Sequence, residues 1–226
     1  WYVKNRLYQS CTQSPTLKTP LSLIISRMSS SNSNTIKAQA YFQGEIGRSP
    51  LVNKLGITAQ QELEAVEAFY VEHTIVNGLS KKAQSLSPAG LCQMHYEMFG
   101  EIYEWAGEYR NYPTGRDLPF CLPEFIENSL NAIYKTLNQE ITPNIDKQSF
   151  IKSAAKFIGE LNVVHPFVDG NGRTQRQTLA LIAQKAGFTL AISDKLVKEE
   201  WYLAAAESQA TATYDRFELI IASLIE

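Results

Sequence analysis

The chain has 226 residues, enough for one domain with a sizeable core, and 44% of them are hydrophobic while 19% are charged. The formal net charge is -2 without long runs of one sign, which argues against a broad nucleic-acid surface. No stretch is long and apolar enough to cross a bilayer, and the three cysteines are spaced too widely for a disulfide framework or a zinc site. We therefore expect a cytoplasmic protein without direct contacts to nucleic acid or membrane.

The first 40 residues differ in composition from the rest of the chain. They are rich in Ser, Thr, Asn and Gln and lack a hydrophobic period, and the run at 29–34 is typical of a flexible linker. We expect a flexible or upstream leader over residues 1–40 and one domain over residues 41–226.

The first helical pattern runs from Thr58 to about Leu79. Thr58 is expected as the N-cap, with Gln61 as its capping-box partner. The apolar residues expected on its inward face are Leu63, Val66, Phe69, Tyr70 and Ile75.

A second helix is expected to begin where Pro88 follows Ser87. Its apolar stripe comprises Leu91, Met94, His95, Met98, Ile102 and Trp105. We interpret His73 and His95 as packing residues on such stripes.

Residues 106–122 are too interrupted by Gly and Pro for a helix. Two short strands at 110–114 and 118–122 are expected to form a hairpin around Gly115 and Asp117. Further helices are expected over about 123–139, 147–163, 173–186, 195–210 and 214–225, the third of them capped by Gly187. The prediction is a mostly α domain with one small β-hairpin.

A compact loop between two of these helices carries the candidate chemistry. Its sequence is His165-Pro166-Phe167-Val168-Asp169-Gly170-Asn171-Gly172-Arg173-Thr174-Gln175-Arg176. Gly170 and Gly172 permit backbone angles that turn N–H groups inward to form an anion-binding nest, and the dipole of the next helix adds positive potential there. Arg173 and Arg176 are three apart and share one helical face, so we expect a polyphosphate site.

Two other side chains of the loop complete this prediction. Asp169 lies at the mouth of the expected phosphate site, and Mg²⁺ prefers one or two carboxylates combined with phosphate oxygens and water. A neutral imidazole at His165 can accept a hydroxyl proton at physiological pH. Taken singly, each is common in turns, caps and solvated surfaces. Ordered around one helix N-terminus, they predict a phosphate pocket, a metal ligand and a base.

The stretch from His165 to Arg176 resembles the motif of the Fic family, His-x-Phe-x-Asp/Glu-Gly-Asn-Gly-Arg-x-x-Arg, at every defining position. Residues 102–107 look like the family's segment ahead of its flap, and the likeness extends over residues 41–226. It implies a mostly α fold, a helical bundle with a small β-hairpin flap beside the active site. A related subgroup that behaves as kinases carries Lys where this chain has Gly172, which favours the AMP-transferring branch.

The resemblance implies a protein adenylyltransferase that moves AMP from ATP to a Tyr, Thr or Ser hydroxyl of a target protein. His165 would be the base, Phe167 would anchor the loop, and Asp169 would hold Mg²⁺. The phosphates would be bound by Gly170, Asn171, Gly172, Arg173 and Arg176, with the Asn171 side chain adding a donor. The flap would hold the target segment as an added strand, and its residues would be Thr114, Gly115, Arg116, Asp117, Leu118, Pro119, Phe120 and Cys121.

Many Fic proteins are inhibited by a helix with the pattern Ser/Thr-x-x-x-Glu-Gly/Asn, whose Glu pairs with the second motif arginine, here Arg176. The segment from Thr58 to Glu62 has the spacing, but Leu63 follows, and an ordinary capped helix explains it better. The chain therefore resembles stand-alone Fic toxins whose inhibitory helix comes from a separate small antitoxin protein. The resemblance also points to type II topoisomerases as targets.

Two alternatives stay open at this point. A non-catalytic Fic-fold module would bind nucleotide or protein, although the intact motif argues against it. The other alternative keeps the chemistry and changes the donor to UTP or a phosphocholine carrier, because the motif binds the diphosphate and does not read the base. Trp201 or Tyr202 is a candidate for the wall of an adenine pocket, with core packing as the simpler interpretation of both.

Overall fold

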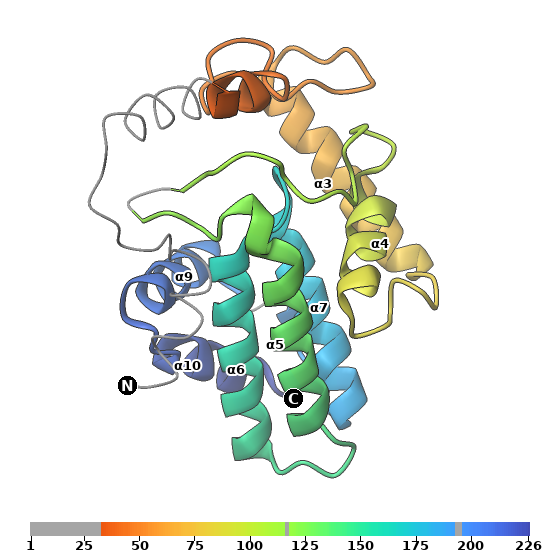
Figure 1. Cartoon of the computed structure of the whole chain (residues 1–226). Helices are drawn as coiled ribbons and strands as arrows, with labels where there is room; N and C mark the ends of the chain where they lie inside the picture. Colours follow the sequence, from red (N-terminus) through yellow and green to blue (C-terminus); the bar gives the residue numbers. More distant parts are fainter. Residues whose placement is uncertain (1–32, 116–117, 193–195) are drawn as a thin grey trace, which may run out of the picture.

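The computed structural model describes residues 33–115, 118–192 and 196–226, and most of them are helical (Figure 1). The elements are α3 (Gln60–Asn77), α4 (Pro88–Phe99), the 3-10 turn η1 (Pro123–Phe125), α5 (Ile126–Glu140), α6 (Lys147–Val164), α7 (Asn171–Ala186), α9 (Lys198–Thr211) and α10 (Asp215–Leu224). The predicted mostly α fold class is confirmed. No helix in the described ranges is long and apolar enough to cross a membrane.

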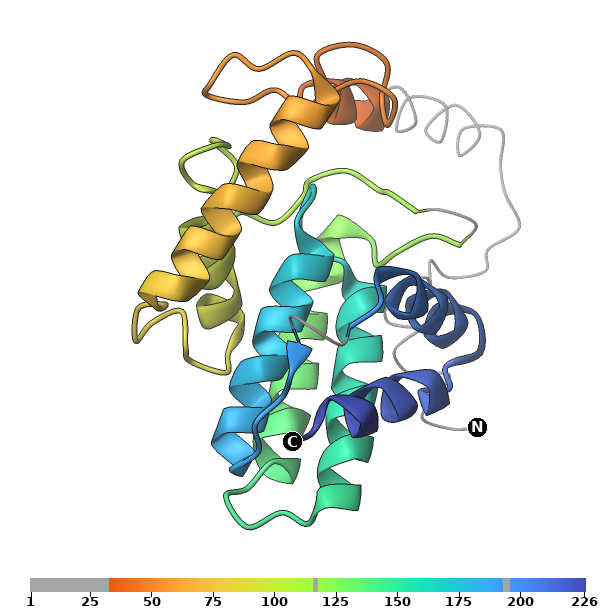
Figure 2. The ribbon, with the colours of Figure 1, turned by 180° about the vertical axis from the view of Figure 1, so that it is seen from behind.

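Helix α6 is the centre of the domain, because it contacts α5, α7, α9 and α10 (Figures 1 and 2). Its predicted inward face is confirmed, with all five residues at most 3% exposed: Phe150, Ala154, Phe157, Ile158 and Leu161. Helices α3 and α4 pack on each other over a second apolar cluster, which includes Met94, Phe99 and Tyr103. The loop from α6 to α7 lies where these two clusters meet, since Phe167 belongs to the first and Val168 packs against the second.

Most of the predicted helix boundaries are confirmed by their caps. The Ser87 hydroxyl accepts a hydrogen bond from Gly90 N at 3.1 Å at the start of α4, and Asp146 caps α6 through Ser149 N at 3.0 Å. Gly187 ends α7 with φ 85°, a left-handed conformation that glycine adopts at little cost.

The prediction for α3 is wrong in two details. Its N-cap is Ala59, without a side-chain cap, so the capping box of Thr58 and Gln61 is not formed. Its buried side chains are Leu63, Glu67 and Val71, whereas Phe69 is 61% exposed. The helix is rotated relative to the hydrophobic pattern because its inward face carries an ion pair of Glu67 in addition to apolar contacts.

The segment ahead of η1 does not form the two strands expected at 110–114 and 118–122. In its described part, the β pairing is one antiparallel bridge between Gly115 and Pro119, with a Phe120 N bond to Thr114 O at 3.0 Å. A longer ladder fails because Pro119 has no N–H to donate, while Cys121 N bonds to Val163 O of α6 instead. The flap residues Arg116 and Asp117 lie outside the described residues.

The expected leader, residues 1–40, lies mostly outside the described residues. Residues 33–39 are helical, and the expected leader stays a prediction. Ala38 in this turn is only 6% exposed, which shows that the turn packs on the domain.

One buried acid in α6 leads to a pH-dependent prediction. Burial raises the pKa of Glu160 to about 7, with Lys156 opposing the shift and Glu140 adding to it. Because the folded value lies above the ordinary 4.5, the stability due to the protonated carboxyl is full below pH 4.5 and is lost as pH rises through about 7.

We expect Glu160→Gln, which mimics the protonated acid, to stabilise the protein by about 1–3 kcal/mol at pH 8 and hardly at all at pH 4.5. Urea unfolding at both pH values measures this difference. Glu72→Gln, which changes an exposed acid on α3, is the control. An equal gain for Glu160→Gln at both pH values would contradict the assignment.

Candidate active site

The loop from α6 to α7 begins at His165, where hydrogen bonds fix the backbone conformation. This residue ends α6 in the left-handed conformation, φ 46° and ψ 61°, and its N–H bonds to Leu161 O at 3.0 Å. Non-glycine residues adopt this conformation at a cost, and such strain gathers at functional sites. The guanidinium of Arg110 compensates by donating from Nε to His165 O at 2.7 Å.

Arg110 is 1% exposed, and its hydrogen bonds to the described residues go to backbone carbonyls. Its Nη1 donates to Tyr112 O at 2.8 Å, and its Nη2 donates to Val164 O at 3.2 Å and to Cys121 O. A cation at the C-terminus of α6 is also favoured by the helix dipole. One side chain therefore ties the end of α6 to both sides of the flap.

The middle of the loop is held by side-chain contacts to its backbone. Asn171 clamps Phe167, accepting from its N–H at 3.0 Å and donating to its carbonyl at 2.9 Å. His95 of α4 is fully buried, stacks on Phe167 with ring centroids 3.9 Å apart, and bonds through Nε2 to Asp169 O at 2.9 Å. Gly107 N donates to His95 Nδ1, so Nε2 carries the proton, and burial lowers the pKa of His95 to about 3. His95 thus holds the loop as a neutral donor.

Gly170 is required at the start of α7 for two reasons. Its φ of 78° is left-handed, and a Cβ would lie 2.6 Å from Cε2 of Phe99 and 3.1 Å from Nε2 of His95. Gly172 is less constrained, because a Cβ would meet only Arg176 Nη1 at 3.4 Å. The tight approach at Gly170 places the first turn of α7 against α4.

The first turn of α7 presents unpaired donors to a cavity. Thr174 N makes the first helical bond, to Gly170 O at 3.0 Å, and no side chain caps the helix, so the N–H groups at 171–173 have no helical partner. The cavity beside them has a volume of about 370 Å³, within the range of small-molecule sites. Its walls come from the loop, the first turns of α7, the flap and α9. It can therefore receive an anion at the N-terminus of α7.

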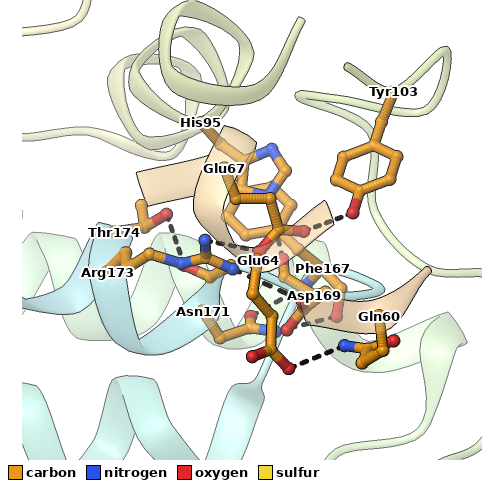
Figure 3. A network of polar contacts seen from close by, with 11 residues as sticks. Gln60, Glu64, Glu67, His95, Tyr103, Phe167, Asp169, Asn171, Arg173 and Thr174 are labelled. Carbon is orange, nitrogen blue, oxygen red and sulfur yellow. Dashed lines mark hydrogen bonds and ion pairs between the residues drawn. The ribbon is translucent and has the colours of Figure 1, made fainter. Parts of the chain in front are cut away.

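The two motif arginines face different surroundings. Arg176 lines the cavity, and it forms no ion pair with any residue of the described ranges. Burial, together with the nearby Arg173, lowers the pKa of Arg176 below its usual range. The usual pKa of an arginine is so high that the side chain still keeps its positive charge. Arg173 instead turns to α3, where it pairs with Glu67 at 2.7 Å, and it reaches Asp169 at 3.4 Å (Figure 3). Arg176 therefore faces the cavity, whereas Arg173 contacts two carboxylates, and phosphate binding by both arginines stays a prediction.

His165 lines the same cavity, next to the flap. Its ring stacks on Phe120 with centroids 3.8 Å apart and planes 5° from parallel. The carbonyls of Leu118 and Pro119 accept from Gln209 of α9 at 3.1 and 3.2 Å, which anchors the flap to the cavity wall. The imidazole therefore lies in the cavity wall, in contact with the flap.

The comparison with known proteins agrees with this arrangement. Residues 85–183 match the Fic/DOC family. The chain is 33% identical over 152 residues to the probable protein adenylyltransferase y4lH of Sinorhizobium fredii, covering 64% of this chain and 76% of that protein. The chain belongs to the Fic/DOC family. It is also 30% identical to the probable protein adenylyltransferase Fic of Escherichia coli, covering 76% of this chain and 86% of that one.

A solved Fic structure matches the same fold. The BepC protein of Bartonella tribocorum, determined with bound AMPPNP, superposes with a TM-score of 0.74 at 25% identity and covers 84% of this chain and 98% of that one. The predicted family and helical Fic fold are therefore confirmed.

In this Fic domain, the motif residues found in the cavity wall are His165, Asp169, Asn171, Gly172 and Arg176. The Asn171 side chain accepts from Phe167 N and donates to Phe167 O, and its predicted contact with phosphate stays a prediction. Trp201 and Tyr202 both line the cavity, Trp201 as a core residue 3% exposed and Tyr202 as a half-exposed one.

Sequence reasoning missed several residues that shape this site. Glu67, His95 and Arg110 all contact the motif from segments at least 55 residues away. Gln175 is 2% exposed at the cavity, and its Nε2 lacks a hydrogen-bond partner among the described residues. His95 was predicted to pack on an apolar stripe, but its bond to the loop was not. The sequence signal for Glu67 and Arg110 is weak, because an acid or an arginine inside a helix or loop is usually solvated.

The residues at the phosphate end fit a Mg²⁺ ion shared with a ligand. The side chain of Asp169 is 51% exposed at the cavity, which leaves its carboxylate accessible. No group of three metal-binding side chains gathers in the described ranges. A single carboxylate combined with phosphate oxygens and water suits Mg²⁺ better than an all-protein cage would.

Proposed function

We propose that this chain transfers AMP from ATP to a hydroxyl side chain of a target protein. The observation that carries the proposal is that three kinds of group share one cavity. The N-terminal turn of α7 with Arg176 and the imidazole of His165 all line it, and His165 stacks on Phe120 of the flap, where a target segment would dock. Relatives at 30–36% identity are named protein adenylyltransferase, and the BepC structure holds AMPPNP, which supports ATP as the donor.

The cavity supports a direct displacement at the α-phosphorus. His165 accepts the proton of the target hydroxyl, whose oxygen forms the new P–O bond while the bond to pyrophosphate breaks. The N–H groups at the start of α7 and the Arg176 guanidinium hold the phosphate charge that moves onto the leaving group. Asp169 would hold Mg²⁺, which supplies charge neutralisation on the phosphates when bound.

The flap is proposed to hold the target. Gly115 and Pro119 approach each other as one bridge, and Gln209 fixes the carbonyls of Leu118 and Pro119. A short β segment whose position is fixed by a neighbouring helix is suited to receive an added strand. The ring of Phe120 then keeps His165 next to the docked hydroxyl.

We propose further that the chain is the toxin of a toxin–antitoxin pair acting in the cytoplasm, with type II topoisomerases as the first targets to test. Arg176, the arginine that an inhibitory glutamate would engage, has no ion pair within the described ranges. Glu62, which has the inhibitory spacing from Thr58, is exposed at the start of α3. A small partner protein that supplies a glutamate to Arg176 should restore growth when co-expressed with the chain. Normal growth with the active chain alone would contradict the toxin proposal.

The deciding experiment is transfer of label in a bacterial lysate. The purified chain is incubated with Mg²⁺ and ATP labelled on the α-phosphate, beside His165→Ala. A labelled protein band with the wild type alone is the expected result, and mass spectrometry of the band identifies the target. Label from UTP but not ATP would change the donor. Clean ATP binding without any labelled band would favour a non-catalytic binding module.

A further inference from the structure

A carboxylate that belongs to no part of the loop motif reaches the site from α3. Glu67 is 5% exposed, and both of its oxygens are engaged: Oε1 accepts from the Tyr103 hydroxyl, and Oε2 accepts from Arg173 Nη1 at 2.7 Å (Figure 3). A buried acid that keeps its charge requires such partners. Glu67 therefore fixes the position of the Arg173 guanidinium.

Arg173 is fixed on three sides. Its guanidinium carbon lies 4.6 Å from the centroid of the Phe99 ring, Nη1 bonds to Glu67, and Nη2 reaches Oδ2 of Asp169 at 3.4 Å. The side chain thus bridges a carboxylate of α3 and the carboxylate of the loop. A rigid planar guanidinium transmits orientation between two such groups better than a flexible ammonium does.

The pair is expected to persist when ligand binds. If Arg173 turned away to a phosphate, Glu67 would remain buried with only the Tyr103 hydroxyl, and an uncompensated buried charge is strongly unfavourable. Arg176 already faces the cavity, whereas Arg173 is not among the residues that line it. Arg176 therefore faces the ligand cavity, and Arg173 contacts the loop.

The side chain of Asp169 depends on this arrangement. Its backbone carbonyl is fixed by His95, but its half-exposed carboxylate has Arg173 as its partner. We propose that Glu67 is a positioning residue that, through Arg173, orients the Asp169 carboxylate at the phosphate end of the cavity. The inference rests on the proposed function in one respect, because Asp169 is taken there to hold Mg²⁺.

The test compares Glu67→Gln with Glu64→Gln, a change of the same kind one turn earlier on α3, where the exposed Glu64 accepts from Gln60 at 2.8 Å. Binding of AMPPNP is measured calorimetrically with Mg²⁺ and with EDTA, and transfer of label is titrated with Mg²⁺. We expect Glu67→Gln to raise the Mg²⁺ concentration for half-maximal binding and transfer about 10- to 100-fold. Affinity in EDTA should stay within about threefold, and Glu64→Gln should match the wild type.

Several outcomes decide against the inference. An unchanged Mg²⁺ requirement in folded Glu67→Gln would show that the role of Glu67 is purely structural, and would overturn the inference. Faster transfer by this variant would overturn it in favour of an inhibitory contact. If Glu67→Gln fails to fold, the Mg²⁺ requirement of Arg173→Gln tests the inference in the same way. Because Glu67 is proposed to act through Arg173, the double variant should shift the Mg²⁺ requirement no further than either single variant does. If the wild type labels no protein, the proposed transfer fails, but the binding measurement still tests Glu67.

Discussion

A His165→Ala variant should lose transfer of AMP by about 10²- to 10⁴-fold, which is the usual contribution of a positioned general base. Nucleotide binding should stay within a few-fold of the wild type, because the phosphate donors come from α7 and Arg176. The loop backbone should also persist. The bonds of His165 to Leu161 O and from Arg110 Nε involve only its backbone, and this chain already holds an alanine, Ala212, at φ 51°.

The measurement pairs single-turnover transfer with AMPPNP binding, and Arg176→Ala is its counterpart. Arg176→Ala should lose most of the nucleotide affinity, because Arg176 is the motif arginine that faces the cavity. The two variants therefore separate the base from the phosphate site. Transfer by His165→Ala within tenfold of the wild type would show that another group takes the proton.

The sequence predicted those parts of the fold that depend on local signals. The caps at Ser87 and Gly187 are set by neighbouring residues, and the α6 face follows one helical period. The loop motif could also be predicted, because the residues of the expected nest, base and carboxylate lie close together in the chain. The rotation of α3 could not be predicted, because the hydrophobic pattern of that helix favoured Phe69 over Glu67 as an inward residue.

The parts that were missed depend on contacts between distant segments. Glu67 is separated from Arg173 by 106 positions and His95 from Asp169 by 74, so no local pattern relates them. The flap was predicted as two strands because its composition suits a hairpin. In the structure, the bonds that would extend it go to α6, to Arg110 and to Gln209 instead. Competition from tertiary partners decides such a segment.

Arg110→Met should have the largest effect on stability of any change near the site. Its guanidinium satisfies the carbonyls of Tyr112, Cys121, Val164 and His165. Methionine fills part of the volume but donates nothing, and each buried acceptor left unpaired is costly. We expect a loss of about 3–5 kcal/mol, comparable to breaking a buried charged network. For a chain of this size the melting temperature should fall by roughly 2–4 °C per kcal/mol.

Calorimetric melting measures this loss, with Arg48→Met as the control. Arg48 is 78% exposed and pairs only with Glu45 in the same turn, so its loss should cost less than about 1 kcal/mol. A melting temperature for Arg110→Met equal to that of Arg48→Met would refute the structural role. Arg110→Lys should fall between them, because a single ammonium nitrogen cannot span four carbonyls that a planar fork reaches.

The same variants connect stability to activity. Arg110 bonds to the carbonyl of His165 and to the flap at Tyr112 and Cys121, so it sets the distance between the base and the docked target. In folded Arg110→Lys at low temperature, we therefore expect a slower transfer step and a raised KM for the target, with nucleotide affinity unchanged. A change confined to nucleotide affinity would place Arg110 in the phosphate site instead, whereas the carbonyls that it contacts belong to the end of α6 and to the flap.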